Sequence, residues 1–160
     1  MVGQDPIAAS LKHPALGDFY RLWSTCRQGG AMPAMSTIHG ADLAPWRANL
    51  TVIEVKAVGG FRYAFYGRSL REAFGVDMTG ADLTQLPPDR GAVLKAEYRT
   101  VVQSAAPAWR LYTAQFDGAW QTWERVVLPV ADEPVAGQAA RVGWLLVAAY
   151  RIDHPVSMTT

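Results

Sequence analysis

Few side chains in this sequence are placed where they could do chemistry together. Glu124 and Arg125 are neighbours in a run of strand-forming residues, and adjacent side chains of a strand point to opposite faces of a sheet. They therefore cannot act as one catalytic pair. Asp132 and Glu133 precede Pro134 in a stretch typical of a solvated loop. Glu124 is the polar residue that most needs a partner, and the simplest expectation is an ion pair with a nearby arginine.

The histidines and the single cysteine also stand apart from one another. His13, His39 and His154 lie in three separate segments. Cys26 can form no intramolecular disulfide and no cysteine-based zinc cluster, and its helical spacing from Trp23 indicates a small buried hydrophobe rather than a reactive thiol. The sequence contains no phosphate-binding glycine loop, metal-ligand spacing or nucleophile elbow. We therefore predict no catalytic residues and no metal site.

Composition narrows the class of protein. The chain has 160 residues, is 50% hydrophobic, and balances 15 basic against 14 acidic residues, so a nucleic-acid partner is not expected. The longest apolar run, Val142 to Tyr150, has nine residues, whereas a membrane-spanning helix needs roughly 20. Residues 1–13 do not have the pattern of a signal peptide. These features predict a single-domain, cytoplasmic protein without a membrane span.

Periodicity divides the chain into segments. We expect a flexible leader over 1–13, an amphipathic helix over 14–30 that Gly29-Gly30 ends, and an extended connector over 31–48 with one short turn around Ala41 to Ala44. The core then covers 49–151, and 152–160 form a flexible tail. Within the core, β-branched, aromatic and turn residues predict strands over 49–56, 61–66, 109–115, 120–130 and 141–150, with helical segments over 69–74, 81–86 and 87–107.

This order predicts an α+β fold, in which a five-stranded antiparallel sheet has helices inserted after its second strand. The last strand is apolar on both faces, since Val142, Trp144 and Leu146 alternate with Leu145, Val147 and Ala149. Both faces of the sheet must therefore be covered. The inserted helices can cover only one, so we expect the N-terminal helix, from this subunit or from a partner, to cover the other.

Short motifs occur in order between Leu16 and Tyr150. They are Leu22-Trp23, Arg27-Gln28-Gly29-Gly30, Met32-Pro33, Phe61-Arg62-Tyr63 leading to Gly67, Ala73-Phe74-Gly75, Met78-Thr79-Gly80 with Leu83, Tyr98 with Val101-Val102, and Trp123-Glu124-Arg125 leading to Leu128-Pro129. In this arrangement the sequence resembles the PAS domain family, and specifically bacterial single-domain PAS proteins with an N-terminal amphipathic helix.

The sequence departs from that family at two places. Residues 34–40 lack the charges that commonly follow the Met-Pro motif, and Ala64 stands where an arginine often follows the tyrosine. Recognition of a partner or polar ligand through those groups is therefore not implied for this chain.

The resemblance implies a sheet curved around the inserted helices, enclosing either a cavity or a filled core. Dense packing of protein interiors favours the filled core. If there is a cavity, a small hydrophobic ligand with one hydrogen-bonding end near Tyr98 or Tyr112 fits it best. The candidate wall residues are Phe65, Leu70, Phe74, Leu83, Leu86, Leu94, Tyr98, Val102, Tyr112 and Trp123. Heme is not expected because no histidine falls on the inserted helices, and covalent flavin photochemistry is excluded because Cys26 precedes the core.

The resemblance implies a non-enzymatic sensory or protein-interaction module in bacterial signalling. We expect a homodimer, because aromatic anchors are enriched at interfaces, with Leu16, Phe19, Tyr20, Trp23 and Trp144 as the candidate interface. A chain of 160 residues leaves no room for an output domain, so we expect the signal to pass to a downstream protein. The alternative is a cone-shaped α+β carrier or enzyme, which predicts a deep cavity with a polar pair at its base.

Overall fold

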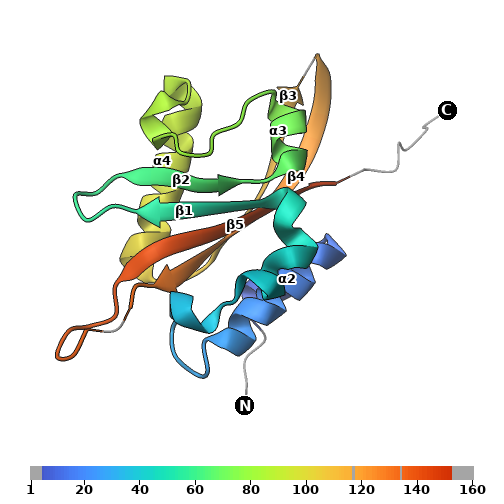
Figure 1. Ribbon diagram of the computed structural model, residues 1–160. Coiled ribbons are helices and arrows are strands. Elements are labelled where there is room, and N and C mark those ends of the chain that lie inside the picture. Colours follow the sequence, from blue (N-terminus) through green and yellow to red (C-terminus); the bar gives the residue numbers. More distant parts are fainter. Residues whose placement is uncertain (1–4, 117, 134, 153–160) are drawn as a thin grey trace.

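A five-stranded antiparallel sheet, in the order β2-β1-β5-β4-β3, organises the chain. The computed structural model describes residues 5–116, 118–133 and 135–152. Figure 1 shows β1 and β2 beside the long β5, with β4 and β3 beyond it. The strands are β1 (Leu50–Val55), β2 (Phe61–Tyr66), β3 (Ala108–Phe116), β4 (Ala119–Ala131) and β5 (Val142–Ile152). This sheet confirms the predicted α+β fold.

The helices divide between the two faces of the sheet. Between β2 and β3 come α3 (Arg68–Phe74), the 3-10 turn η3 (Leu83–Gln85) and α4 (Pro88–Ser104). Before β1 come α1 (Pro6–Ser10), α2 (Pro14–Cys26), η1 (Met35–Thr37) and η2 (Gly40–Asn49). Leu146 and Ala148 of β5 pack with the α2 side chains, whereas Leu145 and Val147 pack with Tyr98 of α4. We call these the outer and the inner face.

The outer face is covered by the chain's own N-terminal helix. Leu16, Phe19 and Trp23 are almost fully buried against β4 and β5, as the two-faced apolar pattern of β5 requires. The start of α2 is fixed locally, since Pro14 occupies its first position and His13 Nδ1 accepts a hydrogen bond from the Ala15 amide at 3.1 Å.

The segment before α2 differs from the flexible leader we expected. Residues 1–4 lie outside the described part of the chain, but residues 6–10 form α1, and the Asp5 side chain accepts hydrogen bonds from the Ile7 and Ala8 amides. The Tyr20 hydroxyl donates to the same carboxylate. Asp5 therefore joins this segment to α2. The tail predicted over 152–160 lies outside the described residues except for Ile152, which ends β5.

Two further predictions need correction. The short turn predicted around Ala41 to Ala44 is part of a longer element, since the 3-10 helix η2 covers Gly40–Asn49 although Pro45 lies within it. Pro87 and Pro88 before a helical stripe predict a helix that Asp89 caps, but α4 begins after Pro87 without a side-chain cap, and Asp89 lies in its first turn. By contrast, Gly75 ends α3 in the left-handed conformation, with φ of 73°, as a glycine at that place predicts.

Candidate ligand-binding site

A pocket of about 650 Å³ lies between the inner face of the sheet and the helices α3 and α4. Its walls are mainly aliphatic and aromatic, with a few polar groups, which is the usual make-up of a small-molecule site. They are formed by Thr51, Tyr63, Tyr66, Leu70, Phe74, Val76, Leu86, Asp89, Arg90, Val93, Leu94, Tyr98, Arg110, Leu111, Tyr112, Thr113, Ala114, Arg125, Val147 and Ala149. The pocket lies beside a packed inner cluster that includes Tyr63, Leu83 and Val101.

The pocket unites part of the predicted wall. Six of the ten candidate residues line it, namely Leu70, Phe74, Leu86, Leu94, Tyr98 and Tyr112. Leu83 and Val102 pack nearby in the inner core instead. Trp123 is buried beside Leu70, with its ring 5.3 Å from that of Phe74. It therefore packs against two lining residues without lining the pocket itself.

Phe65 is on the wrong face for the predicted role. Strict alternation along β2 would place it with Phe61 and Tyr63, which are in the inner core. The pairing of β1 with β2 shifts register between Val52 and Ile53, and such a bulge reverses the side-chain order beyond it. Phe65 therefore packs with the outer cluster, beneath the Arg47 guanidinium at 5.4 Å.

The sequence reasoning missed the polar end of the pocket. Arg125 lines it from β4, only two residues after Trp123. Because residues two apart in a strand share a face, the placement of Trp123 on the inner face already implied that of Arg125. Thr51 and Tyr63 could have been found by the same alternation, and so could Arg110, which lies two residues before the predicted wall residue Tyr112 in β3.

Arg125 forms a buried ion pair with Glu97 of α4. The Arg125 Nη2 and Nε atoms both donate to the Glu97 carboxylate, the latter at 3.3 Å. Each side chain is only 10% exposed. The guanidinium also lies 4.8 Å from the centre of the Tyr112 ring, a favourable arrangement for a cation over an aromatic face. The pair thus tethers α4 to the middle of the sheet.

Three phenols surround this pair. Burial raises the pKa of Tyr63 to about 12, partly offset by Arg125 and by a hydrogen bond with Tyr98. Burial likewise raises the pKa of Tyr98 well above its usual value, and that of Tyr112 to a lesser extent. These hydroxyls therefore stay protonated near neutral pH and can act as hydrogen-bond donors.

Glu124 has a different partner from the arginine we expected. Its carboxylate is fully buried on the outer face. It accepts hydrogen bonds from the Lys12 amide at 2.9 Å, the His13 amide at 2.8 Å and the Trp109 indole at 2.9 Å. The residue therefore fastens the segment between α1 and α2 to the sheet, and this role corrects the ion-pair prediction.

Of the residues considered for metal and cofactor chemistry, His13, His39 and Cys26 do not line the pocket. His13 caps α2 and packs 4.5 Å from the Tyr150 ring, and His39 precedes η2. His154 lies outside the described residues. Cys26 is half-buried against the outer cluster, where burial and the nearby Asp42 raise the pKa of its thiol. Among the described residues, no helix is long and apolar enough to cross a membrane.

The order of the strands, with the helices inserted between β2 and β3, settles the architecture. The fold is PAS-like. Comparison with known proteins adds likenesses of structure only: no family model matches the sequence, and no curated protein matches it.

Several solved structures are similar to this PAS-like chain. The N-terminal domain of a diguanylate cyclase with a PAS/PAC sensor from Marinobacter aquaeolei has 14% identity and a TM-score of 0.46, and the match covers 64% of this chain and 92% of that one. The PAS domain of histidine kinase ThkA has 14% identity and a TM-score of 0.41, with 62% and 98% covered. The sensor region of a sensor histidine kinase has 18% identity and a TM-score of 0.42, with 92% and 56% covered.

Proposed function

We propose that this chain is a non-enzymatic, PAS-type sensory or protein-interaction module that binds a small, mostly apolar molecule. The observation that carries the proposal is the pocket of about 650 Å³ on the inner face of the sheet. This volume falls within the range of roughly 300 to 1,000 Å³ that is usual for small-molecule sites. Apolar walls such as Leu70, Phe74 and Leu94 favour an aliphatic or aromatic ligand.

The polar groups of the pocket support binding rather than catalysis. Arg125 and Glu97 are hydrogen-bonded to each other, and the neighbouring phenols have a raised pKa. A general acid or base works best with a pKa near the operating pH, and these phenols do not offer one. They are better suited to orienting a ligand.

Strand β4 provides a physical link from the pocket to the N-terminal segment. Arg125 faces the pocket, while Glu124 holds the amides of Lys12 and His13 on the outer face. A ligand that displaces Arg125 would shift the same stretch of strand that anchors this segment. We propose that a downstream protein partner reads such a shift at the N-terminal helices.

The homodimer that we predicted stays a prediction. Leu16, Phe19, Tyr20 and Trp23 are buried against the chain's own sheet, and Trp144 is half-buried beside them. A dimer built through these residues would therefore require the two copies to exchange α2. Sedimentation at tens of micromolar would show whether such a dimer forms.

Mass spectrometry of the purified protein tests the ligand-binding proposal. We expect an added mass under native conditions that disappears on denaturation, and an absorption spectrum would reveal a coloured ligand. Ala114→Phe fills the pocket and should abolish the added mass, whereas Ala92→Phe, on the exposed side of α4, should retain it. A bare polypeptide mass, with no small molecule from a broad library binding to it, would contradict the proposal.

A carrier or enzyme with a true internal pocket is the second candidate. It is favoured by the buried Arg125 and Glu97 pair, because that model predicts a polar pair at the pocket base. Incubation of the protein with the recovered ligand separates the two functions. Chemical conversion of the ligand would indicate an enzyme, and recovery of the ligand unchanged would support a binding module.

A further inference from the structure

The charged groups of the pocket are not balanced. Arg90, Arg110 and Arg125 line it together with Asp89, and Glu97 pairs with two of the arginines. Arg110 and Arg125 thus face the single carboxylate of Glu97, which leaves an excess of one positive charge at that place beside an otherwise apolar wall. A charge excess at one place in a pocket attracts a ligand group of opposite sign.

Arg110 and Arg125 share the single carboxylate of Glu97 unequally. Arg125 takes both of its oxygens in direct hydrogen bonds. Arg110 Nη1 lies 3.7 Å from Glu97 Oε2, which is longer than a hydrogen bond. The Arg110 side chain is 51% exposed, against 10% for Glu97. Arg110 is therefore held near the pocket by its attraction to Glu97, but it makes no direct hydrogen bond to the Glu97 carboxylate.

We propose that the pocket selects an amphipathic carboxylate, with its anionic head at Arg110 and its apolar tail among Leu70, Phe74 and Leu94. This inference rests on the proposed ligand-binding function and names the class of ligand. The planar guanidinium matches a carboxylate with two parallel hydrogen bonds. The protonated Tyr112 hydroxyl lines the same pocket and can donate to the same head group.

A carboxylate suits this site better than a neutral or cationic head. A neutral hydroxyl would leave the excess positive charge uncompensated, and an ammonium group would add to it. A head group without a tail would not remove the apolar walls from water, and that burial supplies most of the affinity of such a pocket. Both halves of the ligand are therefore required.

Calorimetric titration with three matched probes tests this proposal. The probes are octanoate, octanol and octylammonium, which share a chain length and differ in the charge of the head. We expect octanoate to bind about tenfold more tightly than octanol, a ratio equal to about 1.4 kcal/mol, and octylammonium to bind most weakly. Acetate, which has the head without the tail, should give no measurable binding.

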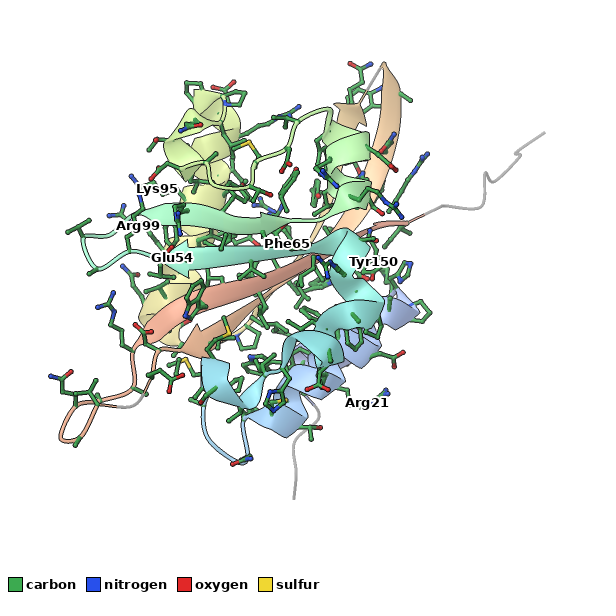
Figure 2. All side chains as sticks on the ribbon, in the orientation of Figure 1. Arg21, Glu54, Phe65, Lys95, Arg99 and Tyr150 are labelled. Atoms are coloured by element: carbon green, nitrogen blue, oxygen red, sulfur yellow. The ribbon has the colours of Figure 1, made fainter. Side chains whose placement is uncertain are left out.

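Two variants locate the anionic head. Arg110→Gln, at an exposed position, should weaken octanoate binding by about fivefold, as expected for a partly exposed ion pair, and leave octanol binding unchanged. Glu97→Gln removes the competing carboxylate and should strengthen octanoate binding. Arg99→Gln is the control, since this exposed arginine on α4 lies outside the pocket wall. Figure 2 labels Arg99 near Lys95 of the same helix.

The failure of this inference can be separated from that of the proposed function. Equal binding of octanoate and octanol, or octanoate binding that Arg110→Gln and Arg99→Gln change alike, would overturn the carboxylate proposal and leave an apolar ligand site. If none of the three probes binds and the purified protein carries no ligand, both proposals fail. Circular dichroism of each variant confirms that the measured protein is folded.

Discussion

Glu124 and Arg125 are adjacent in β4, yet their charged groups lie on opposite faces of the sheet and hold different parts of the molecule. The Glu124 carboxylate binds the Lys12 and His13 amides on the outer face. The Arg125 guanidinium binds Glu97 on the inner face. One dipeptide thus fastens the N-terminal segment to one side of the sheet and α4 to the other.

Glu124→Gln should destabilise the protein by about 1 to 3 kcal/mol. The carboxylate accepts hydrogen bonds from two backbone amides and from the Trp109 indole, and an amide brings its own N–H group toward these donors, leaving a buried donor unsatisfied. Denaturant unfolding measures the loss, and limited proteolysis should show earlier cleavage before α2. Glu72→Gln, at an exposed position of α3, serves as the control. Equal stability of the two variants would contradict the anchoring role.

The strands could be predicted from the sequence because their signals are local. Residues 61–66 combine strand-forming side chains with a glycine turn, and the structure has β2 over that range. The predicted cover of the second face by α2 also followed from local periodicity. The full ten-residue extent of η2 could not be found in this way, since Pro45 and weak periodicity are typical of an extended connector.

The polar end of the pocket depends on contacts that are distant in sequence. Glu97 lies on α4 and Arg125 on β4, 28 residues apart, and the local sequence around either residue does not predict their contact. Phe65 was misplaced for a related reason, because the bulge opposite Val52 and Ile53 depends on the pairing partner of β2. Alternation and helical spacing assign faces correctly only where the register is unbroken.

Two glycines should respond in opposite ways to alanine. Gly17 lies inside α2 with no atom within 4 Å of a new Cβ, so Gly17→Ala should stabilise the protein by about 0.5 to 1 kcal/mol through helix propensity. At Gly67 a Cβ would lie 2.4 Å from the Ala48 carbonyl oxygen. Gly67→Ala must therefore move backbone, at a cost of about 1 to 3 kcal/mol. Thermal unfolding should show a midpoint above the wild-type value for Gly17→Ala and below it for Gly67→Ala.

Stability should fall as the pH rises from about 10 to about 12. Burial raises the pKa of Tyr63 from its usual 10 to about 12. Between these values the hydroxyl ionises in the unfolded chain but keeps its proton in the folded chain. Rising pH therefore stabilises the unfolded state relative to the folded state. Between pH 9.5 and pH 11.5, Tyr63 alone should contribute a loss of about 2 kcal/mol. Unfolding by urea at pH 9.5 and 11.5 measures it. Tyr63→Phe should show a smaller fall, and an identical fall would contradict this role.

Trp23 and Trp120 should differ sharply in their effect on stability. Trp23 of α2 is 1% exposed, and its indole donates a hydrogen bond to the Pro129 carbonyl at 2.8 Å. Trp23→Ala should cost about 3 to 5 kcal/mol, because it leaves a cavity and an unpaired carbonyl. Trp120 is 70% exposed, so Trp120→Ala should change stability by less than about 0.5 kcal/mol.

The same pair of variants tests whether the apolar residues of α2, namely Leu16, Phe19, Tyr20 and Trp23, form a dimer interface. If wild-type protein sediments as a monomer and Trp23→Ala lowers stability independently of protein concentration, these residues act within one chain. If α2 is exchanged between two copies, unfolding of wild type shifts with protein concentration, and Trp23→Ala weakens that dependence while Trp120→Ala preserves it. Because Leu16, Phe19 and Trp23 pack on β4 and β5 of their own chain, a dimer through these residues requires exchange of α2, and the second result is the one that would confirm the predicted homodimer.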